Sequence, residues 1–270
     1  MIPCLAQICS LNSAFDADVD EYSAGGCRAI EIWLTKLEEF LSTHGLSEVR
    51  QLREKHDVAF PVASIQYGLL ESQGSRREES WNLFLRRLDL CRELEIGILI
   101  VACDVSQPLS QQVLDRVGAS LVQIADEAGR HEVRAALEFQ ASASFGNNLQ
   151  TAAALVEDVG SPSLGLCLDT FHYHVGSSKL EDLRCLTRDN LFHVQVSDLA
   201  DVPRELATDS DRILPGEGEI ALPAIIDRLR EIDYLGHVSI ELMNPRIWQV
   251  PALQFGEIGM AALRNLLAKE

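Results

Sequence analysis

Short apolar segments alternate with longer amphipathic segments along the whole chain, and this alternation limits the possible folds more than any other feature. We predict eight strands, which begin at Cys4, Ala29, Ala63, Ile96, Arg134, Leu164, Leu191 and His237. Helical patterns, in which apolar side chains recur every three or four residues, include residues 77–94, 109–129, 222–232 and 251–270. Eight such strand–helix units with nearly continuous apolar strands predict a parallel sheet closed into a (β/α)8 TIM barrel.

An open, doubly wound sheet is the alternative arrangement of these elements. Such sheets usually carry a glycine-rich phosphate-binding turn after the first strand, and residues 8–20 (ICSLNSAFDADVD) contain no glycine. No linker, low-complexity run or shift in composition interrupts the pattern. We therefore expect residues 1–270 to form a single barrel domain.

The chain is strongly acidic, with a formal net charge of −18. This charge argues against nucleic acid or an anionic membrane as a partner, because both attract clustered lysine and arginine, and it favours a neutral, sugar-like small molecule. The seven cysteines form no C-x-x-C pair, and the N-terminus lacks the features of a signal peptide. No apolar run approaches the roughly 20 residues that cross a bilayer. We expect a soluble, cytoplasmic protein.

Three carboxylates stand out near the carboxyl ends of the predicted strands, where TIM barrels collect their catalytic residues. Glu138, Asp169 and Glu241 lie inside the apolar stretches AALEF, LCLDTF and SIELM, and an unpaired carboxylate is costly to bury there. No lysine lies in a predicted strand. A divalent cation such as Mn or Mg would neutralise these oxygen ligands. Ion pairs with arginine, or helix caps at the rim, are the alternative.

The segment FHVQVSD, in the seventh predicted strand, raises the question of a fourth ligand. His193 and Gln195 share one face of this strand. Gln195 lies four residues after the start of its strand, as Glu138 and Glu241 do after theirs, and Asp169 lies five after its own. His193 would lie about 6–7 Å lower at a rise of about 3.3 Å per residue. We therefore predict Gln195 as the fourth metal ligand and His193 as a buried group beneath it.

Two further side chains are candidates for catalysis and substrate binding. His172 follows the sixth strand and would carry a proton or bind a substrate hydroxyl; a hydrogen bond to a rim carbonyl is the alternative. Arg212 lies in the loop after the seventh strand and would hold a substrate oxygen, unless it forms an ion pair with Asp209 or Asp211.

Residues at the ends of the second and third strands are candidates for the wall of a polyol pocket. The second strand carries Glu31 and Trp33, and the third carries Gln66 and Tyr67. We predict that Trp33, Gln66 and Tyr67 bind substrate; ordinary packing is the alternative for each of them.

Several motifs resemble the xylose isomerase-like barrel family, the superfamily of sugar isomerases and epimerases that also contains endonuclease IV. They are AIEIW, ALEF, LDTFHYH, HVQVSD, DRILPGEGEI and VSIELMNP, and the resemblance covers essentially the whole chain. Its strongest likeness is to the inosose isomerase branch. The resemblance implies one divalent ion (Mn, Mg, Co or Zn) held by Glu138, Asp169 and Glu241, and a possible homo-oligomer. The nuclease branch fits poorly, because its members need histidine-rich metal clusters and a basic face.

The fourth ligand of this family is commonly a histidine, whereas this chain has Gln195 at that position. Bacterial 3-dehydroshikimate dehydratases of the same superfamily look similar around a glutamine in the seventh strand, so the departure leaves the metal in place but leaves the reaction open.

We therefore expect a metal-dependent isomerase or epimerase of a keto-sugar or an inosose-like keto-cyclitol. It would act through a metal-stabilised enediolate, with Glu138 and Glu241 as base and acid. The first alternative is a dehydratase of an inosose or a 3-dehydroshikimate-like substrate in the same pocket, and the second is a non-catalytic sugar-binding barrel. A Schiff-base aldolase is excluded because no predicted strand contains lysine.

Overall fold

The computed structural model describes residues 1–268, and it confirms the predicted fold class. Eight parallel strands form a closed barrel in sequence order. The strands are β1 (Ile2–Ala6), β2 (Ala29–Trp33), β3 (Ala59–Gln66), β4 (Ile98–Cys103), β5 (Arg134–Phe139), β6 (Leu164–Asp169), β7 (Leu191–Val196) and β8 (His237–Ile240). The predicted starts of β2, β5, β6, β7 and β8 are the observed starts.

The first strand differs from the predicted segment CLAQICS (Cys4–Ser10), because it begins two residues earlier, at Ile2. It ends at Ala6, and Gln7–Ser10 form a 3-10 helix, η1. The polar side chains of η1 bond both to helix α1 and to the sheet: Gln7 Nε2 donates to Phe15 O, the Ser10 hydroxyl pairs with that of Tyr22, and Gln7 Oε1 accepts from the N–H of Trp33 in β2. All four residues of η1 are buried, so burial alone does not distinguish this helical turn from a strand. The predicted starts of β3 and β4 are wrong by four and two residues, respectively.

The chain divides into two compact units. The terminal unit comprises Met1–Ala63 and the chain from Val194 onward, and the central unit comprises Ser64–His193. The divisions fall inside β3 and β7. The expectation of one domain over residues 1–270 stays a prediction, and its last two residues lie outside the described part of the chain.

In the terminal unit, β1 pairs with both β2 and β8, and the end of β7 pairs with β8. The helices of this unit are α1 (Phe15–Ala24), α2 (Leu34–Leu41), α3 (Leu46–His56), α8 (Leu222–Glu231) and α9 (Ala252–Leu267), with short 3-10 helices η3 (Asp209–Asp211) and η4 (Ile247–Gln249). Helix α8 begins at the predicted residue, and Pro251 is the N-cap of α9 rather than its first residue.

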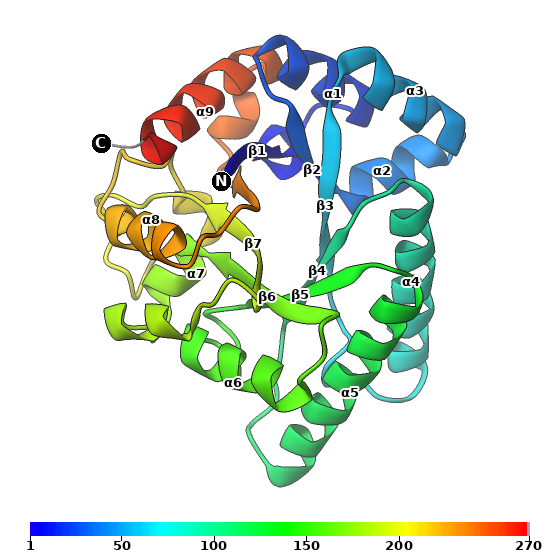
Figure 1. Ribbon diagram of the computed structural model, residues 1–270, viewed down its shortest axis with the longest axis vertical. Helices are drawn as coiled ribbons and strands as arrows, with labels where there is room; N and C mark the ends of the chain where they lie inside the picture. Colours follow the sequence, from blue (N-terminus) through cyan, green and yellow to red (C-terminus); the bar gives the residue numbers. More distant parts are fainter. Residues whose placement is uncertain (269–270) are drawn as a thin grey trace. The chain divides into compact units, whose positions relative to one another are not determined.

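Helices α1 and α9 lie side by side in the terminal unit (Figure 1), and two glycines permit their close approach. A Cβ atom added at Gly25 would lie 2.8 Å from backbone atoms of Gly256 and Glu257. The rings of Tyr22 and Phe255 pack beside this crossing, with centroids 5.8 Å apart. Backbone atoms cannot move aside as a flexible side chain can, so this packing requires glycine at position 25.

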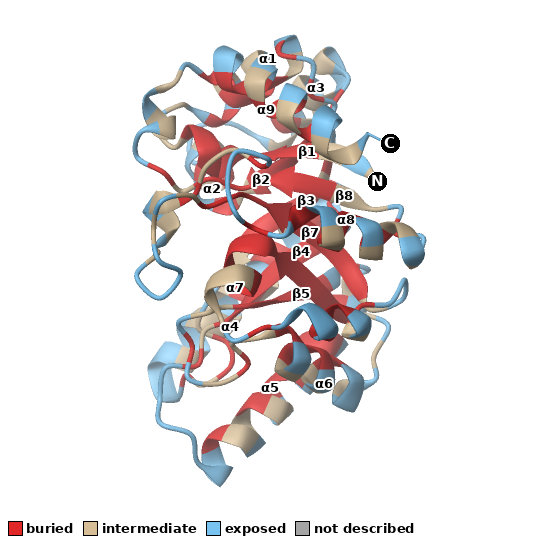
Figure 2. Cartoon of the chain, turned by 90° about the vertical axis from the view of Figure 1, so that its left-hand side faces the viewer, coloured by how far each residue is buried: buried red, intermediate tan, exposed pale blue. Residues whose placement is uncertain are grey.

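In the central unit, β4 pairs with β5 and β5 with β6. Every residue of β4 and β6 is buried, and helices around these strands turn an exposed side outward (Figure 2). The helices are α4 (Gly74–Glu93), α5 (Gln111–Arg130), α6 (Leu149–Val159) and α7 (Thr170–Val175), with the 3-10 helix η2 (Leu180–Cys185). The N-caps of α5 and α6, Ser110 and Asn148, accept backbone hydrogen bonds from Val113 and Thr151.

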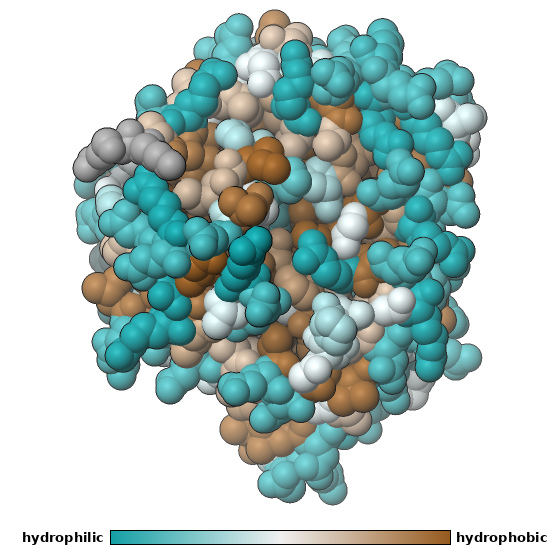
Figure 3. All heavy atoms as spheres, in the orientation of Figure 1, coloured by the Kyte–Doolittle hydropathy of each residue, from teal (hydrophilic) through white to brown (hydrophobic). Residues whose placement is uncertain are grey.

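Hydrophilic residues make up much of the face seen in Figure 3. Among residues 1–268, no helix is both long enough and apolar enough to span a bilayer.

Candidate active site

In the terminal unit, the Gln195 side chain joins two carboxylates. Its Nε2 atom donates to Glu31 Oε1 and to Glu241 Oε1, and both distances are 2.9 Å. Glu31 and Gln195 are fully buried, and Glu241 is 8% exposed. The structure thus brings two of the predicted metal ligands, Gln195 and Glu241, into direct contact, together with Glu31, which the sequence analysis did not assign to the site.

A fully buried guanidinium lies against this group. Arg212 Nη1 donates to Glu241 Oε2 at 3.1 Å, and Arg212 Nη2 contacts Asp209 Oδ1 at 2.7 Å. The Arg212 carbonyl accepts a hydrogen bond from Asn244 Nδ2. The ion pair with Asp209, which the sequence left open as the alternative, is therefore present together with a contact to a predicted ligand. A role for Arg212 in substrate binding stays a prediction.

The adjacent loop PGEG is held by one carboxylate. Asp198 accepts hydrogen bonds from the backbone N–H groups of Leu199, Gly216 and Ile220. A Cβ atom at Gly218 would lie 2.3 Å from Leu199 O. These contacts form a structural turn. Asp198 also pairs with Ile213 through an isolated bridge, so the same residue holds the backbone next to Arg212.

In the central unit, Glu138, Asp169 and His172 form a compact buried cluster. One potential ligand atom from each residue lies within 4.8 Å of the others, and none of the three is more than 5% exposed. Asp169 is also the N-cap of α7, because its Oδ1 accepts from the N–H groups of Phe171 and His172 at 2.6 and 3.1 Å. The two carboxylates supply oxygen donors of the kind that a divalent cation takes.

The contacts of His172 define its tautomer. Its Nδ1 atom accepts a hydrogen bond from the Ala141 N–H at 3.4 Å, so the neutral ring carries its proton on Nε2. This Nε2 lies 3.7 Å from Glu138 Oε1. The side chain therefore presents a proton donor beside a carboxylate, which is the arrangement that acid–base chemistry requires.

The pairing of neighbouring strands shows that distance from a strand start does not give height along the strands. In the sheet, Glu138 is level with Cys167, so Asp169 lies two residues farther along its strand. Gln195 is likewise level with Ser239, two residues before Glu241. Neighbouring strands of a barrel are staggered, and equal distance from a strand start is not equal height. The assignment of Gln195 as the fourth metal ligand stays a prediction. His193 is fully buried, as expected.

The predicted substrate-binding residues have different surroundings. In the central unit, the Gln66 amide is engaged within the protein, because its oxygen accepts from Arg87 and its nitrogen donates to Tyr67 O. Tyr67 is 49% exposed. In the terminal unit, Trp33 lines a hollow of about 550 Å³ together with Asn12, Lys36 and Phe40. Their role in substrate binding stays a prediction.

Lys36 is a buried cation that the sequence analysis overlooked. It lies on α2, three residues after the end of β2, and its ammonium donates to Ser10 O at 2.5 Å and to Asp18 Oδ2 at 2.6 Å. Asp18 is fully buried and Lys36 is 5% exposed. Burial lowers the pKa of Lys36 and raises that of Asp18 from 3.8 to about 6, against the opposing effect of Lys36.

This burial predicts a pH-dependent contribution to stability from Asp18. An unfolded aspartate ionises near 3.8, whereas the folded one keeps its proton to about pH 6. The folded state therefore binds more protons in this window, and the contribution of Asp18 to the free energy of unfolding falls as the pH rises from about 4 to about 6. Urea unfolding of the wild type and Asp18→Asn across this range measures the difference. The exposed Asp16→Asn on the same helix is the control, and a difference that grows with pH would contradict the prediction.

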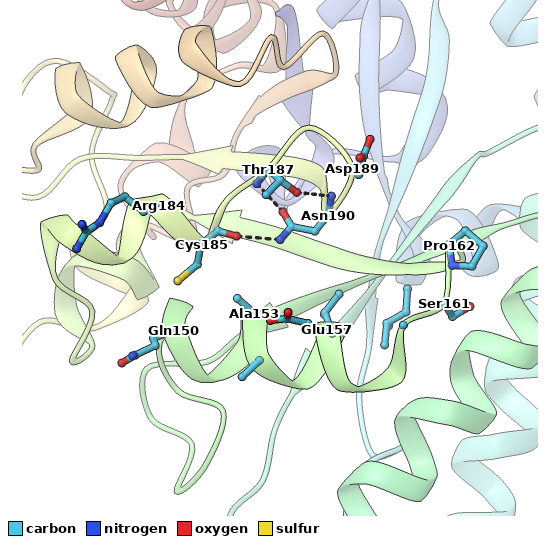
Figure 4. Close-up of a pocket in the computed structure, with 14 residues that line it drawn as sticks. Gln150, Ala153, Glu157, Ser161, Pro162, Arg184, Cys185, Thr187, Asp189 and Asn190 are labelled. Atoms are coloured by element: carbon cyan, nitrogen blue, oxygen red, sulfur yellow. Dashed lines mark hydrogen bonds between the residues drawn. The ribbon is translucent and has the colours of Figure 1, made fainter.

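A separate groove of about 790 Å³ in the central unit lies between α6 and the chain that precedes β7 (Figure 4). Its wall is held by Asn190, which donates to Cys185 O and accepts from Thr187 N–H. It opens beside Leu164 and Asn190, at the amino ends of β6 and β7. Because TIM barrels carry their catalytic groups at the opposite ends of the strands, this groove is not the candidate active site.

Glu31 is a residue of the candidate site to which the sequence alone gave no role. It lies in the apolar stretch AIEIW, the same context that singled out Glu138, Asp169 and Glu241. The rule that identified three buried carboxylates would have identified a fourth.

The chain is similar to several known proteins. Residues 19–266 match the xylose isomerase-like TIM barrel family. The inosose isomerase of Bacillus velezensis is 28% identical over 248 residues, which cover 89% of this chain and 88% of that protein. The 3-dehydroshikimate dehydratase of Pseudomonas putida is 23% identical over 95% of this chain but only 40% of that enzyme. The crystal structure of the IOLI protein with a binding zinc atom has a TM-score of 0.93 at 24% identity and covers 99% of this chain and 98% of that one.

Proposed function

The chain belongs to the xylose isomerase-like TIM barrel family, and on this premise we propose that it is a divalent-metal-dependent isomerase of an inosose-like keto-cyclitol. The observation that carries the proposal is the buried cluster of Glu138, Asp169 and His172, which combines two carboxylates that could hold a metal ion with a proton donor. The similarity to inosose isomerases over most of the chain supports the substrate class. The net charge of −18 also favours a neutral substrate.

The proposed metal ligands are Glu138, Asp169, Gln195 and Glu241. The donor chemistry of the Glu138 cluster supports the first two, and the contact between Gln195 and Glu241 supports treating the other two as a pair. A divalent ion, when bound, supplies Lewis-acid polarisation of a ketone oxygen. His172 is assigned to proton transfer rather than to metal ligation, because its Nε2 carries the ring proton.

The residues of the chain would then move the protons of a 1,2-carbonyl shift. A carboxylate, Glu138 in our assignment, takes the proton from the hydroxyl-bearing carbon next to the ketone. The ketone oxygen gains a proton, and the neighbouring hydroxyl oxygen loses one. His172 Nε2, 3.7 Å from Glu138 Oε1, is placed to exchange protons with the same carboxylate. Glu241 as acid gives a proton to the former carbonyl carbon, and proton exchange with water then returns Glu138 to its anion and Glu241 to its acid form, which completes a redox-neutral isomerisation.

A dehydratase is the second candidate, and Gln195 is the observation that favours it. Glutamine at this strand resembles the pattern of 3-dehydroshikimate dehydratases, and an enzyme of that name is among the relatives. The same proton abstraction would then be followed by loss of a β-hydroxyl as water instead of return of the proton to carbon.

One experiment separates the two candidates. We expect Mn²⁺-loaded protein incubated with 2-keto-myo-inositol in D₂O to give a second keto-cyclitol by proton NMR, with deuterium next to its carbonyl and without loss of water. A vinylic signal would establish elimination and overturn the isomerase. Glu138→Gln is the matched negative control, and an unchanged substrate spectrum with both proteins would contradict this substrate class.

A further inference from the structure

The orientation of the Gln195 amide is determined by chemistry. An amide has one end that donates and one that only accepts, and a carboxylate only accepts. The atom of Gln195 that lies 2.9 Å from both Glu31 Oε1 and Glu241 Oε1 must therefore be the nitrogen. The reverse orientation would place three acceptor oxygens together in a fully buried position, where repulsion is little screened.

The two carboxylates use both protons of the Gln195 amino group. An NH₂ group has two donors, and one is directed to each carboxylate. The Oε1 atom donates to neither carboxylate and is the part of the amide that can ligate a cation. A hard divalent ion binds this oxygen and not the nitrogen, because the neutral NH₂ group of an amide has no lone pair available for ligation.

Glu31 is the more rigid of the two acceptors. It lies in the middle of β2, its backbone is paired level with Ala6 of β1, and the whole residue is buried. Glu241 lies just beyond the end of β8 and is also bound to Arg212 through its other oxygen. Loss of Glu31 would remove one of the two carboxylates that hold the amide nitrogen in this orientation.

We propose that Glu31 is a positioning residue that holds the Gln195 amide with its oxygen available to the metal. Glu31 acts through Gln195 and is not itself assigned as a ligand. The inference rests on the proposed function, since it requires that a divalent ion binds. Because a carboxylate can face only the nitrogen end of an amide, each buried carboxylate beside Gln195 favours the same orientation of its side chain.

Two substitutions separate positioning from charge. Glu31→Gln removes the negative charge but keeps an oxygen that can accept from Gln195, whereas Glu31→Met removes both. If Glu31 positions the amide, we expect Glu31→Met to weaken Mn²⁺ binding by about 10–100-fold, the usual effect of losing a group that orients a ligand, and Glu31→Gln to weaken it much less. Competition of the metal-free protein with a chromophoric chelator measures the affinity. Glu54→Met and Glu54→Gln, on the exposed surface of α3, are the matched controls.

A double-mutant cycle with Gln195→Ala tests whether the effect passes through Gln195. In that background, we expect Glu31→Met to change the Mn²⁺ affinity less than about twofold, because the group that it orients is gone. An equal loss in the Gln and Met variants, or a loss that persists without Gln195, would overturn the positioning role while leaving the metal site intact. If the wild-type protein binds no Mn²⁺, both the proposed function and this inference fail.

Discussion

Asp169→Asn is expected to leave the protein folded but to remove most of its affinity for divalent metal. Asparagine keeps an oxygen that can accept from the N–H groups of Phe171 and His172, so the cap of α7 survives, while the negative charge of the proposed ligand is lost. Metal catalysis supplies several kcal/mol of stabilisation, so the isomerisation rate should fall by roughly three orders of magnitude. Metal content after dialysis and the NMR assay measure the two effects, and circular dichroism checks the fold.

Asp182→Asn is the matched control for this substitution. Asp182 lies in the same unit, is 9% exposed, and also accepts a backbone hydrogen bond at a helix start, from Lys179 N–H. We expect it to change neither metal content nor rate. Full metal content in Asp169→Asn would remove Asp169 from the ligand set, and full metal content in Glu138→Gln as well would show that the buried cluster is not the metal site.

The sequence predicted the barrel well where a strand is bounded on both sides by a change of residue type. The strand RAALEF begins at the exposed Arg134 and is otherwise buried, so the change from a charged to an apolar residue marks its start in the sequence. The first strand fails this condition, because the buried residues of η1 follow it without a change to exposed residues. The polar side chains of Gln7 and Ser10 are satisfied by Phe15 and Tyr22, which lie 8 and 12 residues farther along the chain. Hydropathy reports burial, not the direction in which the backbone turns.

The candidate site was predictable in its residue types but not in its pairings. The apolar context of Glu138, Asp169 and Glu241 identified them as buried carboxylates, and Glu31 has the same context. No spacing rule, however, shows that Gln195 joins Glu31 to Glu241, because these contacts span 164 and 46 residues of sequence. Lys36 was overlooked for a similar reason, since it lies on a helix and reaches Ser10 and Asp18 only through the fold.

Arg212→Met is expected to lower the free energy of unfolding by about 3–5 kcal/mol, the usual cost of removing one partner of a buried ion pair. The guanidinium is fully buried, and its loss removes the positive charge beside the carboxylate of Glu241, a residue that is only 8% exposed. Arg212→Lys should retain part of the stability, because an ammonium keeps the charge but cannot bridge Asp209 and Glu241 as the planar fork does. Urea unfolding in the presence of a chelator measures these values without stabilisation by bound metal.

Two comparisons show whether the burial of Arg212 is the cause of the expected loss of stability. Arg92→Met breaks an exposed pair with Asp89, with side chains 47% and 54% exposed, and should cost no more than about 1 kcal/mol. The double variant Arg212→Met/Glu241→Gln should recover much of the loss, because it removes the carboxylate charge that the guanidinium balanced. If Arg212→Met costs no more than Arg92→Met, or if Glu241→Gln recovers nothing, the guanidinium is not what compensates Glu241, and a role for Arg212 toward substrate would be the better explanation of its burial.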